Sequence, residues 1–449
     1  MKGIIFLLIL WSSLSYAQSA DEMSRSSSHS VHPISFEALP YWTNDTTTVD
    51  LIIFYRIHPG VFFFAKTTTG QQEIYEAHGE LVFELFDEND AAIARNVRPF
   101  SAVRNSPPEK ADPNSEELQG AITLKLHKGI YKIVVETKDS ESGKSYIDRD
   151  TKIDTRTLSS GVTVSPGIFV EPASSEASLD HQKDFFPLNL GGSILIGQRS
   201  GCLVQVASPD TATDIQLTWN IKSKKEADED HPQEFLGEKY FQQFGSLLVR
   251  ENPKRTFLSL VHDSKRSRIM YIPIPTDRLE MGSYQMTLTV TQGSLKSTKD
   301  FSFNIIWPLK PHSLSDFKLA VDALRHIATE EELDSMNAFS SSKSMNAFRI
   351  FWQKRSPDTT RAFNPAMAEY YRRTDESIKR FSSANESDGY RTDRGRIFIL
   401  FGSPSITNRL LKPNSAPTEI WTYEKLKQRF IFTDQRKTGN FILIKMENY

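Results

Sequence analysis

The hydrophobic periodicity of this chain changes once, and that change constrains the fold more than any other feature. Between about residues 36 and 307, apolar and polar residues alternate in short runs that end at glycine, proline or acidic turns. A period of two is typical of half-buried β-strands. Beyond the proline-bounded segment 307–311 the period lengthens to that of amphipathic helices. We therefore expect a long β region, followed by a separate domain that begins near residue 308.

The β region divides into two parts, which we expect at residues 36–155 and 156–307. In the first part, strands are predicted at 49–57, 61–64, 79–86, 122–126 and 129–135, with a hairpin connection at 140–145. In the second part, strands are predicted at 161–170, 193–196, 202–207, 215–221, 257–261, 270–274, 282–290 and 301–307. Such short strands without a helical period between them are typical of antiparallel sandwiches. We predict two tandem immunoglobulin-like β-sandwiches, with one large sandwich carrying insertions as the alternative.

The two β parts share a short motif in which a turn glycine precedes a tyrosine by two residues. It reads Gly129-Ile130-Tyr131 in the first part and Gly282-Ser283-Tyr284 in the second. A tyrosine can bury its ring at the edge of a core while its hydroxyl reaches a polar partner. We expect each hydroxyl to bond a loop carbonyl.

Residues 308–449 are predicted to form an α+β domain, with helices first and a small antiparallel sheet second. Helices are expected at 317–327, 330–339, 347–354 and 364–381. The second is introduced by a capping box, in which Thr329 and Glu332 exchange hydrogen bonds with backbone donors. Strands are expected at 396–401, 419–423, 430–433 and 441–445.

The N-terminus has the order of features that defines a secretory signal. Lys2 precedes an apolar run, and Ser15-Tyr16-Ala17 offers small residues for cleavage before Gln18. We expect residues 1–17 to be a signal peptide and the serine-rich residues 18–35 to be a flexible leader. The resulting expectation is an exported protein of the periplasm or the extracellular space, without a transmembrane anchor in the mature chain.

Composition excludes several classes of function. The formal net charge of -2 indicates no overall attraction to nucleic acid. The one cysteine, Cys202, lies in an alternating run and is expected to be a buried structural residue. No histidine follows His326, so the signature part of the chain, from about residue 351 onward, contains no histidine of its own for a catalytic triad or a zinc site. We expect neither a metal nor a cofactor.

The most distinctive segment covers residues 388–404. It joins polar turn residues, Gly389-Tyr390-Arg391-Thr392-Asp393, to a run of β-formers that ends at Gly402. With the block Glu369-Tyr370-Tyr371-Arg372-Arg373 upstream and Glu419-Ile420-Trp421-Thr422-Tyr423 downstream, it resembles the signature of the GWxTD-domain proteins of bacteria. Tyr390 stands where the family name has tryptophan, and residues 374–378 are more polar than the family pattern. The resemblance implies a family without an established activity.

A structural interpretation accounts for each signature residue. Gly389 and Gly395 are expected to adopt backbone angles that other residues resist. Tyr390 is expected to pack its ring on the sheet, and Thr392 and Asp393 to cap backbone donors in the turn. The remaining expectation concerns the charged side chains: Arg394 and Arg396 pair with Asp434 or Glu419.

A catalytic interpretation uses the carboxylates of the same segment. Two carboxylates that flank a glycosidic bond can serve as acid and as base or nucleophile. The candidate carboxylates are Asp388, Asp393, Glu419 and Asp434, and the aromatic residues that would stack on sugar are Tyr390, Trp421 and Tyr423. This hydrolase of envelope glycans is the alternative. Our main expectation is a non-enzymatic envelope or secreted protein that binds an envelope protein or glycan.

Overall fold

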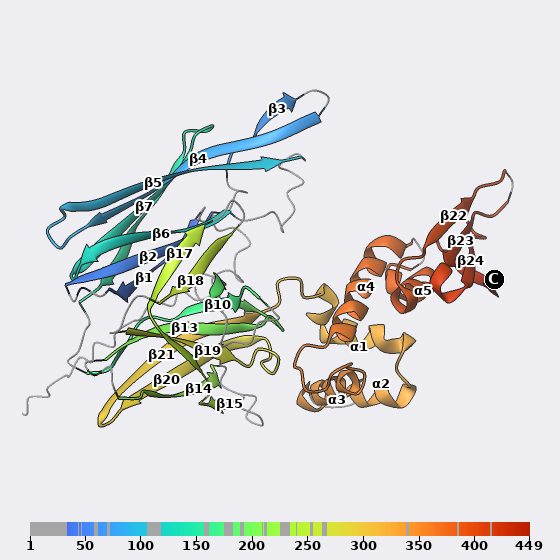
Figure 1. Cartoon of the computed structure of the whole chain (residues 1–449). Helices are drawn as coiled ribbons and strands as arrows, with labels where there is room; N and C mark the ends of the chain where they lie inside the picture. Colours follow the sequence, from blue (N-terminus) through green and yellow to red (C-terminus); the bar gives the residue numbers. More distant parts are fainter. Residues whose placement is uncertain are drawn as a thin grey trace, which may run out of the picture. The chain divides into compact units, whose positions relative to one another are not determined.

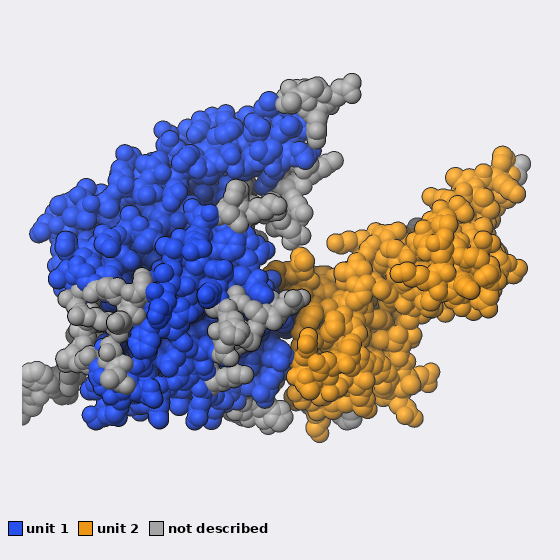
Figure 2. Space-filling model, viewed as in Figure 1, with its two compact units in different colours: residues 1–306 blue, residues 307–449 orange. Residues whose placement is uncertain are grey.

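The computed structural model describes residues 34–449 apart from gaps at 44, 46, 58–61, 70–71, 106–117, 157–160, 175–182, 189–192, 209, 211–212, 225–233, 239, 252–254, 263–266, 338–340, 384–385 and 414. The predicted signal peptide and almost all of the predicted leader lie outside the described residues. The chain forms two compact units, Met1–Ile306 and Trp307–Tyr449 (Figure 2). The first is built from mostly antiparallel sheets, and the second holds the helices and one small sheet (Figure 1).

The first part of unit 1 contains two facing sheets. One is three-stranded in the order β1-β2-β6, with β1 (Ile34–Trp42), β2 (Thr48–Ile57) and β6 (Leu118–His127). The other contains β3 (Ala65–Thr69), β4 (Gln72–Phe86), β5 (Ala92–Arg104), β7 (Ile130–Asp139) and β8 (Ser145–Asp154). Apolar side chains from both sheets, including Leu51, Ile53, Leu81 and Phe83, form a core between them.

The second part of unit 1 repeats this arrangement with larger sheets. An eight-stranded sheet contains β9 (Thr163–Val164), β10 (Ile168–Pro172), β11 (Asp184–Pro187), β13 (Ser200–Ala207), β16 (Phe241–Phe244), β17 (Ser246–Glu251), β18 (Thr256–Val261) and β19 (Ser267–Ile274). A five-stranded sheet contains β12 (Ser193–Leu195), β14 (Gln216–Ser223), β15 (Glu234–Gly237), β20 (Gly282–Gln292) and β21 (Leu295–Ile306). Val204, Ile272, Met286 and Phe303 belong to the core between them, which also encloses the buried Cys202.

A third core joins the two sheet pairs into one unit. The face of β1-β2-β6 that points away from the first core packs Ile52 and Phe54 with Val170 and Leu203 of the eight-stranded sheet. The amide of the buried Gln205 spans the same boundary, because it accepts from Trp42 N at 2.7 Å and donates to Trp42 O at 2.8 Å. The three-stranded sheet is therefore buried on both faces, which explains its nearly continuous apolar runs.

The glycine–tyrosine motif buries a tyrosine ring in both parts. The hydroxyl of Tyr131 donates to His127 O at 2.7 Å, and that of Tyr284 donates to Glu280 O at 2.8 Å. Each ring is buried, and each hydroxyl bonds a carbonyl four residues upstream, which belongs to the last residue of β6 for Tyr131 and to the segment before β20 for Tyr284. The prediction of a ring in the core is confirmed for both tyrosines, and that of a loop carbonyl as acceptor is confirmed for Tyr284, whereas the acceptor of Tyr131 ends a strand.

Unit 2 begins with helices and ends with a four-stranded antiparallel sheet. Its helices are α1 (Phe317–Ala323), α2 (Glu330–Asn337), α3 (Ser341–Gln353), α4 (Pro365–Phe381) and α5 (Asp393–Phe401), with short 3-10 turns that include η5 (His312–Leu314), η6 (Leu324–His326) and η7 (Gly389–Arg391). The sheet order is β22-β23-β24-β25, with β22 (Ile406–Leu410), β23 (Thr418–Tyr423), β24 (Gln428–Thr433) and β25 (Ile442–Asn448). The capping box is confirmed: Thr329 N donates to Glu332 Oε2 at 3.0 Å, and Glu332 N donates to Thr329 Oγ1 at 3.2 Å.

Several local predictions were wrong. Residues 62–64 lie outside any strand, and β3 begins only at Ala65; β1 already begins at Ile34, inside the expected leader. The largest error is at 396–401, which is the body of helix α5 and not a strand. In the described part of the chain, no helix is long and apolar enough to cross a membrane.

Candidate functional site

The signature segment forms a 3-10 turn followed by a capped helix. Thr392 is the N-cap of α5: its hydroxyl accepts from Gly395 N at 3.0 Å and donates to Gly389 O at 2.8 Å. At the other end, Gly402 has φ of 77°, a conformation that side chains rarely adopt, and it stops the helix. Capping at both ends therefore overrides the β propensity of the residues between. The expected capping role of Thr392 is confirmed.

Gly389 and Gly395 are required for close packing. Neither has a positive φ among the described residues, so the expectation of unusual backbone angles was wrong. A Cβ on Gly389 would lie 2.2 Å from Ser377 O, and one on Gly395 would lie 2.0 Å from Gly389 O. The turn η7 is thus held against both α4 and α5 by backbone contact. The polar stretch 374–378 helps, because the buried Thr374 and Ser377 present small side chains on α4.

Tyr390 packs among the helices and not on the sheet, which corrects a second expectation. Its ring is buried in the cluster formed by α1, α2, α3 and α4, and its hydroxyl donates to the carboxylate of Asp322 on α1. Burial, together with the bond to Asp322, raises the pKa of Tyr390 to about 12. Arg391 pairs with the same carboxylate, and His326 Nε2 donates to Tyr390 O at 2.9 Å.

Asp393 links helix α5 to the last strand. Its Oδ2 accepts from Leu443 N of β25 at 2.8 Å, and its Oδ1 accepts from Arg396 at 3.1 Å. The expectation that Asp393 caps a backbone donor in the turn was wrong, because the backbone donor that it binds lies 50 residues downstream. The expectation that Arg396 reaches Asp434 or Glu419 was wrong, because Arg396 pairs with Asp393 one helical turn away.

Arg394 and Glu419 form an ion pair that is nearly buried. Arg394 Nη1 lies 3.3 Å from Glu419 Oε2, and the two side chains are 13% and 11% exposed. The other oxygen of Glu419 accepts from the indole of Trp421 at 2.6 Å, while Phe441 stacks on the guanidinium at 4.2 Å. The predicted Arg394–Glu419 pair is confirmed. Removing one partner from such a pair leaves a buried charge, which is strongly destabilising.

Asp434 organises a loop and does not bind either predicted arginine. Its carboxylate accepts from Thr438 N at 3.1 Å and from Gly439 N at 2.7 Å, between β24 and β25. The remaining candidate, Asp388, pairs with Arg391 at 3.3 Å at the edge of η7. Each of the four candidate carboxylates therefore has a structural partner of its own. Among the bonds that the structure describes for them, none joins one candidate to another.

The predicted aromatic platform is also divided. Tyr390 lies in the helical cluster, whereas Trp421 and Tyr423 lie in the core between the sheet and α5. The hydroxyl of Tyr423 donates to Gly402 O at 2.7 Å, next to the end of α5. All three rings are buried, so none presents a face for sugar stacking.

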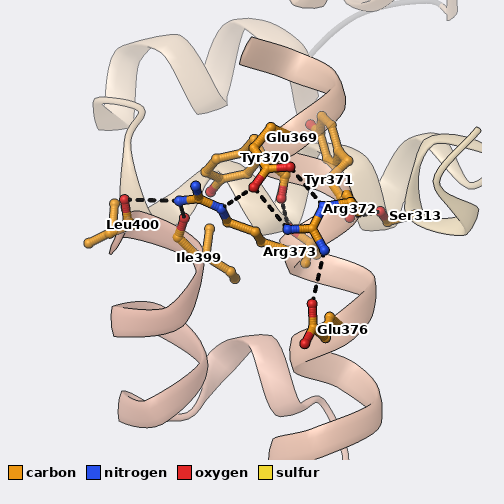
Figure 3. Close-up of polar contacts among 10 residues, drawn as sticks. Ser313, Glu369, Tyr370, Tyr371, Arg372, Arg373, Glu376, Ile399 and Leu400 are labelled. Atoms are coloured by element: carbon orange, nitrogen blue, oxygen red, sulfur yellow. Dashed lines mark hydrogen bonds and ion pairs between the residues drawn. The ribbon is translucent and has the colours of Figure 1, made fainter. Parts of the chain in front are cut away.

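The block 369–373 connects three helices (Figure 3). Tyr370 and Tyr371 donate to Ala323 O and Ala320 O on α1, at 2.6 Å and 2.7 Å. Arg373 reaches the other way, to Ile399 O at 3.1 Å and Leu400 O at 3.3 Å at the C-terminal end of α5. Figure 3 shows Glu369 between the two arginines of the block, bonded to both. The block thus joins α1, α4 and α5 through their carbonyls.

Asp322 and His326 are the residues of this site that sequence analysis missed. They precede Tyr390 by 68 and 64 residues, and only the fold brings them to it. The one local signal in the sequence was Asp322 itself, a carboxylate within the apolar segment that forms α1. Among the described residues, no group of three or more His, Cys, Asp or Glu side chains is arranged to hold a metal ion.

Unit 2 is therefore defined as an α+β domain whose signature turn is clamped between helices and a small sheet. The family model of the GWxTD domain matches residues 291–449, and the chain is accordingly a GWxTD domain-containing protein. The match begins in β20, before the structural boundary at Trp307. No curated protein matches the chain.

Solved structures that are distantly similar to this chain include a hydrolase, a membrane anchored protein and a pilin subunit. A family 123 glycoside hydrolase from Clostridium perfringens shares 15% identity at a TM-score of 0.17, covering 43% of this chain and 35% of that one. A putative membrane anchored protein from Corynebacterium diphtheriae shares 11% identity at a TM-score of 0.17, covering 62% of this chain and 59% of that one. The major pilin subunit BcpA of Bacillus cereus shares 9% identity at a TM-score of 0.14, covering 51% of this chain and 69% of that one. This chain thus spans about a third of the hydrolase, and at these TM-scores the similarities bear on neither fold nor function.

Proposed function

We propose that this protein is an exported, non-enzymatic component of the cell envelope or the secreted fraction. Two tandem immunoglobulin-like sandwiches in unit 1 present the GWxTD domain, and the protein binds an envelope protein or glycan. The observation that carries the proposal is the structural use of every candidate carboxylate. A catalytic acid and base must both reach one reacting bond. In this domain Asp393 and Asp434 bind backbone amides, and Glu419 is held by Arg394 and Trp421.

The burial of Tyr390 and Trp421 supports the same conclusion. Tyr390 is 2% exposed and Trp421 is 1% exposed, so neither ring meets a ligand without unfolding of its surroundings. In this interpretation the signature residues stabilise the packing of α4, α5 and the sheet against one another. The ligand is then bound by other, exposed surfaces of the domain, whose positions the buried signature residues maintain.

The proposal is tested by separating binding from turnover. The full-length mature protein is incubated with insoluble envelope glycan from the native host, and both the protein retained and the sugar released are measured. We expect retention without release of sugar. Release of sugar that disappears in Glu419→Gln or Asp393→Asn, while both variants stay folded, would establish the hydrolase alternative. Absence of retention on every envelope fraction would contradict the binding role.

Export is tested independently in the native host. The order of positive charge, apolar run and small residues supports cleavage before Gln18. Mass spectrometry should find mature chains that begin at or near Gln18. Full-length protein confined to the cytoplasm would contradict the proposed location.

A further inference from the structure

The last strand, β25, exposes both its edge and its apolar side chains. It ends the sheet order β22-β23-β24-β25, so one side of its backbone has no neighbouring strand in the described sheet. Ile442, Ile444 and Met446 are 51%, 55% and 60% exposed. An exposed apolar edge strand is a template for pairing with another strand.

The hydrogen bonds at each end of β25 show which backbone groups are open. Tyr449 N donates to Lys427 O at 3.0 Å, which directs the odd-numbered residues 445, 447 and 449 toward β24. The N–H and C=O groups of Ile444, Met446 and Asn448 therefore point away from the sheet. Asp393 occupies the edge at Leu443, and the bulge between Ile431 and Phe432 lies beside Ile444. The regular open edge is consequently Ile444 to Asn448.

The charges on this short edge are self-complementary. Lys445 and Glu447 lie two residues apart on one face of the strand, where they form an ion pair at 2.5 Å. In an antiparallel pair centred on Met446, Lys445 of each copy faces Glu447 of the other. These positions are non-hydrogen-bonded pairs, in which opposing side chains come closest. Moving the register by two residues either way places Lys445 opposite Lys445 or Glu447 opposite Glu447, which is unfavourable.

We propose that β25 is a self-association edge, through which two copies of this chain pair antiparallel about Met446 into one continuous sheet. Ile444 then hydrogen-bonds opposite Asn448 of the second copy, and the two Met446 side chains pack on the face that carries α5. A two-fold axis makes the contact isologous, so it closes after two copies. A lysine alone on an edge strand opposes pairing with a second strand. A lysine and a glutamate on either side of one residue instead favour the single register in which each faces the other in the second copy.

Charge reversal tests this pairing in the full-length mature protein. Sedimentation equilibrium over a range of concentrations should show a monomer–dimer equilibrium for the parent. Lys445→Glu and Glu447→Lys should each weaken self-association at least about tenfold, because each places like charges opposite one another twice. A mixture of the two single variants should form heterodimers, since the positive edge of one then meets the negative edge of the other. The double variant should dimerise like the parent.

The controls separate pairing from folding and from net charge. Lys412→Glu makes the same change of charge on the exposed β22–β23 connection and should leave the dimer intact. Melting temperatures of all variants should match the parent, because residues 445 and 447 lie on the surface. A parent that stays monomeric at every concentration overturns the proposal. A parent dimer that survives both single reversals, or single variants that do not associate when mixed, overturns it as well.

Discussion

At the scale of single residues, the signature glycines act through the atoms they lack. Gly395 lies directly against Gly389 O, and Gly389 lies directly against Ser377 O. A methyl group added at either position would displace the backbone of a neighbouring segment. Backbone cannot move aside as easily as a flexible side chain can. Sequence alone suggests unusual backbone angles at a signature glycine, but close approach is the equally common reason for one.

The contact at Gly395 gives a direct prediction. Gly395→Ala should lower the free energy of unfolding by about 3 kcal/mol, at the upper end of the cost of overpacking. Gly282→Ala is the matched control, because a Cβ there meets nothing closer than 4.0 Å and φ is ordinary. Urea unfolding of both variants beside the parent measures the difference. Equal, small changes in the two variants would show that η7 is not clamped.

At the scale of elements, α5 shows why a strand was predicted where a helix forms. Residues 397–401 are β-branched, aromatic or leucine, and their local preference favours a strand. The helix is specified by its ends: the Thr392 cap, the φ of Gly402, and the two carbonyls that Arg373 binds. The threonine and the glycine were visible in the sequence as start and stop signals. The contribution of Arg373 was not, because it comes from another helix.

The same junction predicts a dependence on pH. The bond from Arg372, followed by that from Arg373, lowers the pKa of Glu369 from 4.5 to about 2. A lowered folded-state pKa adds stability above the unfolded-state pKa, and that stability is lost as the pH falls from about 4.5 toward 2. Glu369→Gln should therefore lose less stability on acidification than the parent. The difference should be below about 1 kcal/mol, because the carboxylate is partly exposed.

Chemical unfolding at neutral pH and at about pH 3, between the two pKa values, measures this difference. Glu331→Gln is a suitable control, since Glu331 is an exposed glutamate in the first turn of α2. An acid-induced loss in Glu369→Gln as large as that of the parent would remove Glu369 from the account of acid sensitivity.

At the scale of the whole molecule, the structural features that depend on local sequence pattern could be predicted from the sequence. The β region, the change to helices, the capping box at Thr329 and the carbonyl bonds of Tyr131 and Tyr284 follow from period and turn chemistry. Long-range partners did not follow. Neither Asp322 beneath Tyr390 nor the core shared by the two sheet pairs leaves a local signal, since both depend on which surfaces meet after folding.

The division of the chain into two units predicts how unit 2 behaves by itself. A fragment that starts at Trp307 should be soluble and unfold cooperatively. One that starts at Ser313 loses the ring contact of Trp307 with Phe363, at 5.3 Å, and the bond from His312 N to Asp375. It should be less stable by about 1–3 kcal/mol. Thermal melts of the two fragments decide this, and aggregation of the longer fragment would contradict an independent unit.

The central proposal is that the signature carboxylates stabilise the fold and do no chemistry, and a substitution of Asp393 tests it most directly. Asp393→Ala leaves Leu443 N and Arg396 without their acceptor, so the free energy of unfolding should fall by about 1–3 kcal/mol. Asp393→Asn keeps an oxygen for Leu443 N and should lose clearly less. The measurement is the unfolding free energy of both variants and the parent, combined with turnover of envelope glycan. Unchanged stability of Asp393→Ala together with lost turnover would contradict the account.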